Sequence, residues 1–85
     1  MREFVFTKYA KKRFVQLEQR VQDRIIEKLL ILKTVENLPL KKLHDMDPAT
    51  HRLRIGPYRL ILKRESEQTV IVLDIGHRKD IYKSH

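Results

Sequence analysis

The chain has 85 residues, enough for one hydrophobic core and therefore for a single domain over residues 1–85. Its 19 Lys and Arg residues outnumber 11 Asp and Glu residues, and the net charge of +8 favours a polyanionic partner, with nucleic acid before an anionic membrane surface or an acidic protein. The absence of cysteine excludes a thiolate metal site. No stretch is long and apolar enough for a signal peptide or a membrane span, so we expect a cytoplasmic protein without a membrane partner.

The first half of the sequence predicts a strand followed by two helices. An apolar run over residues 4–6 is typical of a short strand, and Thr7 can cap a helix that begins at Lys8. A continuous helix would be long for so small a domain, so we expect a break near residues 18–20 and a second helix that ends before Pro39. Apolar residues recur at helical steps of three and four: Ala10, Phe14, Leu17, Val21, Ile25, Leu29 and Leu32.

The second half predicts a loop and then a sheet. Residues 39–50 have no sustained period and are typical of a connecting loop. Alternating and β-branched residues beyond them indicate strands over residues 52–55, 58–64 and 69–75. The expected fold class is therefore α+β, with an N-terminal strand, a helical hairpin and a three-stranded antiparallel meander packed against the helices.

Arginines gather on the predicted strands. If Gly56 and Pro57 form a two-residue hairpin loop, Arg54 faces Arg59 across the ladder, and alternation puts Arg52 on the same side. Two arginines directly opposite destabilise a sheet by a few tenths of a kcal/mol, roughly, unless an anion lies between them. The pairing therefore predicts an anionic ligand.

The third strand brings further candidates to this place. Its end should return Arg78 to the neighbourhood of Arg59, and Tyr82 follows shortly afterwards. Guanidinium groups hold phosphate oxygens with two parallel donors, and a tyrosine ring stacks on an unpaired base. The pattern predicts a phosphate site for RNA, with Lys63 and Lys79 as additional RNA-binding residues.

Other polar residues receive plainer interpretations. The four histidines show no metal-ligand spacing, so neither a metal nor a cofactor is expected. His77 at a strand end is a possible proton donor, although histidines there are more often structural. The remaining basic residues fit ordinary solvated surface positions, among them Arg13, Arg20, Arg24 and Lys41.

Two motifs resemble a known family. Residues 52–61 contain a Gly-Pro-Tyr-Arg turn, and residues 70–82 finish with Gly-His-Arg-Lys-Asp-Ile-Tyr. At this separation, and after a helical hairpin, they resemble the RelE/ParE superfamily of type II toxins over nearly the whole chain. In the RelE branch, the family cleaves messenger RNA in the ribosomal A site. The ribose 2′-hydroxyl attacks the adjacent phosphate and leaves a 2′,3′-cyclic end.

The resemblance implies site residues and partners. The positions that matter in the RelE branch fall here on Arg52, Arg54, Arg59, Arg78 and Tyr82. Among guanidinium groups, Tyr82 is the expected acceptor of the 2′-hydroxyl proton, and His77 is a candidate donor to the leaving 5′-oxygen. The expected partners are messenger RNA in the ribosomal A site and a cognate antitoxin, whose acidic or amphipathic segment covers the arginines or displaces Tyr82.

The sequence departs from the usual RelE pattern at two positions, where Arg52 and Arg54 replace lysines. Lysine can lose its proton and act as a base, whereas arginine essentially cannot, so the replacement preserves phosphate binding and bears on turnover. Two alternatives remain open. One is a ParE-like toxin that acts on DNA gyrase, and the other is a homologue that binds nucleic acid without cutting it.

Overall fold

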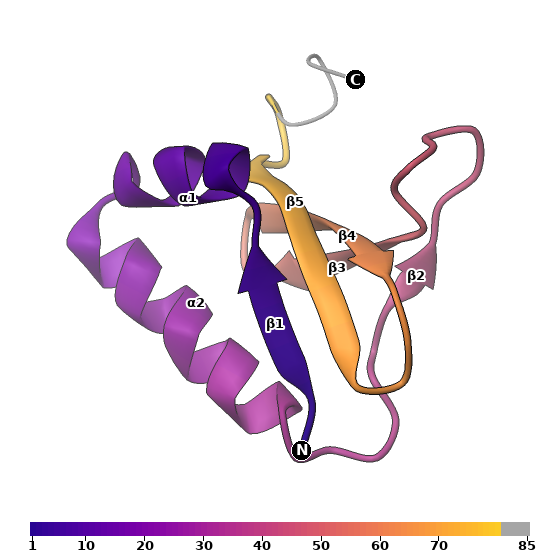
Figure 1. Ribbon diagram of the computed structural model, residues 1–85. Coiled ribbons are helices and arrows are strands. Elements are labelled where there is room, and N and C mark those ends of the chain that lie inside the picture. Colours follow the sequence, from indigo (N-terminus) through magenta and orange to yellow (C-terminus); the bar gives the residue numbers. More distant parts are fainter. Residues whose placement is uncertain (81–85) are drawn as a thin grey trace.

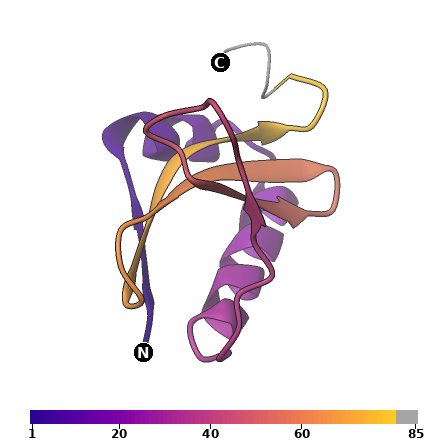
Figure 2. The same cartoon turned by 90° about the vertical axis from the view of Figure 1, so that its right-hand side faces the viewer.

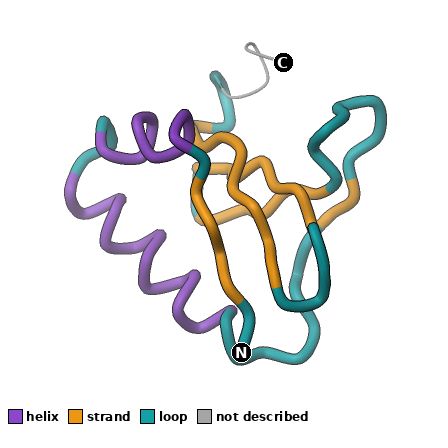
Figure 3. The backbone as a smooth tube through the Cα atoms, in the orientation of Figure 1, coloured by secondary structure: helices purple, strands orange, loops and turns teal. Residues whose placement is uncertain are grey.

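The computed structural model describes residues 1–80. It contains a five-stranded sheet with two helices packed against one face (Figure 1). The strand order is β1-β5-β4-β3-β2, with β1 parallel to β5 and the other pairs antiparallel. The predicted α+β class is confirmed (Figure 3). In chain order the elements are β1 (Glu3–Phe6), α1 (Lys8–Val15), α2 (Gln19–Leu32), β2 (Lys41–Lys42), β3 (His51–Ile55), β4 (Tyr58–Arg64) and β5 (Thr69–His77).

The helical hairpin forms close to the predicted place. Thr7 caps α1, because its side-chain oxygen accepts a hydrogen bond of 3.0 Å from the backbone N–H of Ala10. The break spans residues 16–18, slightly earlier than expected. The side-chain amide of Gln22 donates to the Leu17 carbonyl in the break at 2.8 Å and to the carbonyl of Val15, the last residue of α1, at 3.3 Å. Neither helix is long and apolar enough to cross a membrane, as judged over the described residues.

The second helix ends at Leu32, well before the end expected at Pro39. Arg2, only 8% exposed, reaches this end of the helix from the N-terminus of the chain. Its Nη1 donates to the carbonyl oxygens of Leu32 and Val35 at 2.8 Å each. The charged side chain of Arg2 satisfies carbonyl groups at this end of the helix and interacts favourably with the negative end of the helix dipole. These interactions stabilise the end of the helix at Leu32.

The sheet is larger than the predicted meander. β1 lies parallel to β5, and the expected loop over residues 39–50 contains β2. β2 pairs only with His51 and Arg52, so residues 53–55 of β3 lie along an edge of the sheet that no described strand covers (Figure 2). A strand of two residues has no period that a sequence pattern could show.

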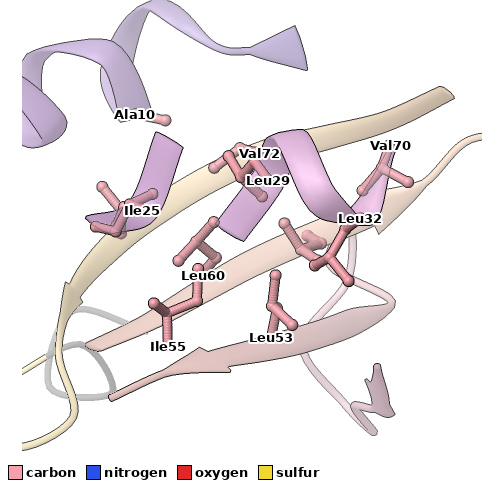
Figure 4. Packing of buried hydrophobic residues seen from close by; sticks show 11 residues of the cluster. Ala10, Ile25, Leu29, Leu32, Leu53, Ile55, Leu60, Val70 and Val72 are labelled. Atoms are coloured by element: carbon pink, nitrogen blue, oxygen red, sulfur yellow. The ribbon is translucent and has the colours of Figure 1, made fainter. Parts of the chain in front are cut away.

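The core lies between α2 and one face of the sheet (Figure 4). Its members include Ile25, Leu29 and Leu32 from the helix, and Leu53, Ile55, Leu60 and Leu62 from β3 and β4. Burying such side chains is the main stabilising contribution to a domain of this size.

A β-bulge in β5 changes the direction of its side chains. Leu62 pairs with Val72 and Ile61 with Asp74, so Leu73 is the extra residue between them. After the bulge, Ile75 points into the core and Asp74 lies on the opposite face. The sequence pattern did not indicate this change.

Candidate phosphate-binding site

Arg54 pairs with Arg59 across β3 and β4, as predicted. The loop between the strands consists of Gly56 and Pro57, and Gly56 has φ of +58°, a value that glycine adopts without strain. Arg54 is exposed and its Nε donates to the Gly56 carbonyl at 3.4 Å, whereas Arg59 is half-buried. The hairpin turn therefore fixes the two guanidinium-bearing residues directly opposite each other.

Arg52 joins this pair on the sheet surface that faces away from the helices. It stands two residues before Arg54 and pairs with Ile61, so alternation puts it on the same side of the strand. We call the surface that carries Arg52, Arg54 and Arg59 the arginine face. All three arginines line one hollow of about 280 Å³, together with Lys28, Pro39, Lys41 and Leu53.

Asp74 is a fully buried acidic residue on the same side of the sheet. One carboxylate oxygen accepts a hydrogen bond of 2.7 Å from the Ile75 backbone N–H and lies 3.4 Å from Nε of Arg13 on α1. The same Nε donates to the Ile75 carbonyl at 3.3 Å. Arg13 is thus an anchor between α1 and β5, which corrects its interpretation as an ordinary solvated residue.

Arg78 lies next to the hairpin turn but outside this hollow. It follows β5 by one residue, and its backbone N–H donates to the Pro57 carbonyl at 2.8 Å. This contact confirms that the end of β5 returns to the start of β4. The Arg78 side chain is exposed and does not line the hollow of the three arginines. Tyr82 falls outside the described residues.

His77 lies on the other face of the sheet, with the helices. It pairs with Tyr58, and the two rings meet edge to face with centroids 5.5 Å apart. Both rings line a separate hollow beside Arg20 and Arg24 of α2. The structure therefore does not bring the imidazole of His77 together with the three arginines.

The two lysines predicted to bind RNA lie outside the hollow of the three arginines. Lys63 lies on the arginine face, farther along β4, and forms an ion pair of 3.2 Å with Glu65. Lys79 is exposed in the turn after β5, and its backbone N–H donates to Nδ1 of His77 at 3.2 Å. Neither lysine lines the hollow of the three arginines. Within residues 1–80, no cluster of His, Asp and Glu side chains could hold a metal ion.

Three guanidinium groups around one hollow can bind an oxyanion. Each can donate two parallel hydrogen bonds to an oxyanion and keeps its charge at any physiological pH. In a site preorganised in this way, cations stabilise developing negative charge by several kcal/mol, roughly. The arrangement suits a phosphodiester whose non-bridging oxygens gain charge during reaction.

Comparisons with known proteins agree with this architecture. Residues 4–82 match the family model described as the ParE toxin of the type II toxin–antitoxin system parDE. The toxin–antitoxin complex RelBE2 from Mycobacterium tuberculosis contains a similar chain, with 26% identity and a TM-score of 0.76 over 91% of this chain and 98% of that one. The RelB–RelE antitoxin–toxin complex from Methanococcus jannaschii gives 26% identity and a TM-score of 0.68 over 95% and 98%.

A third structure, the isolated RelE toxin from E. coli, shares the fold at 21% identity, with a TM-score of 0.71 over 99% of this chain and 94% of that one. No curated protein sequence matches the chain.

Proposed function

Since the chain belongs to the family of ParE toxins of type II toxin–antitoxin systems, we propose that it acts as a ribosome-dependent endoribonuclease that cleaves messenger RNA. The observation that carries this proposal is the hollow lined by Arg52, Arg54 and Arg59. A like-charged pair across a ladder costs stability, and a bound phosphate offsets that cost.

The proposed reaction is an internal transfer within the RNA. The ribose 2′-hydroxyl loses its proton and attacks the adjacent phosphorus. The bond from phosphorus to the 5′-oxygen breaks, which leaves a 2′,3′-cyclic phosphate and, after protonation, a 5′-hydroxyl. Arg54 and Arg59 hold the scissile phosphate together with Arg78 from the neighbouring turn, while Arg52 contacts this phosphate or the next one.

Proton transfer requires separate residues, because arginine is a poor base. Tyr82 is our candidate for accepting the 2′-hydroxyl proton, on the strength of its place in the sequence motif. For the proton given to the 5′-oxygen, we propose a water molecule held by Arg78, rather than His77. The reason is that His77 packs against Tyr58 on the helix side of the sheet.

The proposal includes a cognate antitoxin and the cytoplasm as the place where both act. Two of the similar structures are RelB–RelE complexes, which supports a dedicated protein partner for this chain. A net charge of +8 favours an acidic, amphipathic antitoxin segment that covers the arginine face. Such a segment would keep RNA out of the hollow.

A second target class has support of its own. The matching family is described by ParE, and the resemblance in the sequence includes a ParE branch that acts on DNA gyrase. Under that alternative, induction damages DNA while messenger RNA stays whole.

Primer extension on transcripts after brief induction tests the proposal. We expect new 5′ ends inside coding regions with the unchanged chain and none with Arg78→Ala or Arg54→Ala. Arg20→Ala, which removes an exposed arginine paired with Glu18 at 3.1 Å, is the matched control and should cut like the unchanged chain. Intact transcripts together with a DNA-damage response would replace this proposal with the gyrase alternative, and intact transcripts without damage would leave a non-catalytic binder.

A further inference from the structure

A second hollow adjoins the one lined by the three arginines. It has a volume of about 370 Å³ and lies between α2 and the start of the hairpin loop, with Arg24, Lys28, Ile31 and Arg54 among its lining residues. Lys28 and Arg54 line both hollows. The two spaces therefore meet at the edge of β3, where the arginine face turns toward α2.

The topology leaves this edge accessible. β2 ends at Lys42 and pairs with β3 only at His51 and Arg52, so no described strand covers the edge of β3 at residues 53–55. On α2, Arg24 and Lys28 are four residues apart and hence on one side of the helix. The Arg24 side chain extends to the hairpin loop, since a Cβ atom built on Gly56 would lie 3.5 Å from its Nη1.

The charges along this path are nearly all positive. We define the edge groove as the two adjoining hollows; among the described residues that line them, Glu27 is the one acidic residue. None of its exposed cations Arg24, Lys28 and Lys41 forms an ion pair with an acidic residue in the described part of the chain. The basic residues that line the groove are Arg24, Lys28, Lys41, Arg52, Arg54 and Arg59.

We propose that single-stranded RNA runs through both hollows of the edge groove, with one phosphate held on the arginine face, and that Arg24 and Lys28 bind the RNA backbone next to that phosphate. The choice of RNA rests on the proposed function. The groove is continuous with the phosphate site, and its cations succeed one another along a path. Arg24 and Lys28 are about 6 Å apart along the helix axis, within the span of two stacked nucleotides at about 3.4 Å each.

The affinity for RNA should depend on the length of the oligonucleotide. A trinucleotide would occupy only the hollow of the three arginines, whereas an oligonucleotide of about ten residues would also enter the hollow beside α2. Each phosphate contact in the groove adds about 0.7 to the slope of log affinity against log salt for a single strand. Two cations should therefore account for about 1.4 of that slope.

The experiment measures the binding of 2′-O-methyl oligoribonucleotides, which lack the attacking hydroxyl and cannot be cut. Fluorescence anisotropy at several salt concentrations compares the unchanged chain with Arg24→Gln/Lys28→Gln. For the longer oligonucleotide we expect about a tenfold loss of affinity at about 0.1 M salt and a salt slope lower by about 1.4, with a clearly smaller loss for the trinucleotide, which can contact only Lys28 of the two cations. The control Lys11→Gln/Lys12→Gln removes equal charge from exposed positions on α1 and should change both affinities less than twofold.

Equal losses in the two double variants, or equal losses for the short and the long oligonucleotide, would overturn the inference. A decaglutamate peptide that competes better than RNA of the same charge would also overturn it, since the groove would then be a docking site for an acidic protein. Thermal unfolding shows whether each variant is folded. Because these oligonucleotides are not cut, loss of groove binding and loss of nuclease activity are separate results.

Discussion

Arg54 and Arg59 lie directly opposite each other in the β3–β4 ladder. Nothing in the core requires this pair, because both residues point away from the leucines and isoleucines that α2 covers. Their opposition is a consequence of the two-residue turn at Gly56 and Pro57, and like charges so placed oppose folding slightly. We interpret the arrangement as a binding site for an anion.

Replacing Arg54 by Gln should separate binding from folding. We expect the free energy of unfolding at low salt to stay the same or rise by about 0.3 kcal/mol, because a like-charge contact is lost. Inorganic phosphate should raise the melting temperature of the unchanged chain more than that of Arg54→Gln. Urea unfolding and thermal shifts measure the two effects, with Arg20→Gln as control. A variant that loses several kcal/mol would show that Arg54 is needed for the fold.

Arg2 should be a major structural residue despite its position near the N-terminus. Its guanidinium is buried and donates to the carbonyl oxygens of Leu32 and Val35 at the end of α2. Arg2→Ala leaves these carbonyls without their charged donor, and we expect a loss of about 2–3 kcal/mol of stability. Urea unfolding measures this loss, and Arg2→Lys should recover only part of it, because a single ammonium cannot replace the fork. A loss below about 0.5 kcal/mol would contradict this role.

His51 should make the fold less stable in mild acid. Burial, followed by the positive charges of Arg64 and Lys42, lowers the pKa of His51 below its ordinary value of 6.5. As pH falls through 6.5, the unfolded chain takes up a proton before the folded chain does, so stability is lost from there down to the folded pKa. The melting temperature should therefore drop as the pH falls below about 6.5.

The matched variants for this titration are His51→Gln and His44→Gln. The first should flatten the dependence of melting temperature on pH, because the shifted group is gone. The second removes an exposed loop histidine and should leave the dependence unchanged. Parallel curves for His51→Gln and the unchanged chain would show that another group is responsible.

Few residues should replace Gly56 without a loss of stability, because its backbone conformation, and not the space around it, is the constraint. Its φ is +58°, whereas a Cβ atom there would make only an ordinary contact at 3.5 Å with Arg24. Gly56→Ala should cost about 1–2 kcal/mol of stability, measured by urea unfolding, and Gly56→Asn should cost less. Equal stabilities of Gly56→Ala and the unchanged chain would mean that the turn relaxes to another form.

The parts of this structure that the sequence predicts are those with local causes. The register of the β3–β4 hairpin follows from the length of one turn, and so do the pairing of Arg54 with Arg59 and the position of Arg52. Helical periodicity likewise indicates which residues of α2 enter the core.

The parts that the sequence does not predict depend on contacts between distant segments. The end of α2 is set by Arg2, and α1 is tied to β5 by Arg13 and Asp74. The bulge at Leu73 turns Asp74 away from the core, and no alternation pattern reveals it. The edge groove arises only when α2 packs beside β3, which is why Arg24 and Lys28 gave no signal in the sequence.

The most direct measurement uses purified ribosomes programmed with a short defined messenger RNA whose A-site codon is vacant. The unchanged chain should cut within that codon and leave a 2′,3′-cyclic phosphate, whereas Arg54→Ala and Arg59→Ala should not. A messenger with a single 2′-deoxyribose on the 5′ side of the cut should resist cleavage, because the attacking hydroxyl is absent. Cleavage that persists with the deoxyribose or with both arginine variants, or an unchanged messenger throughout, would contradict phosphate activation on the arginine face.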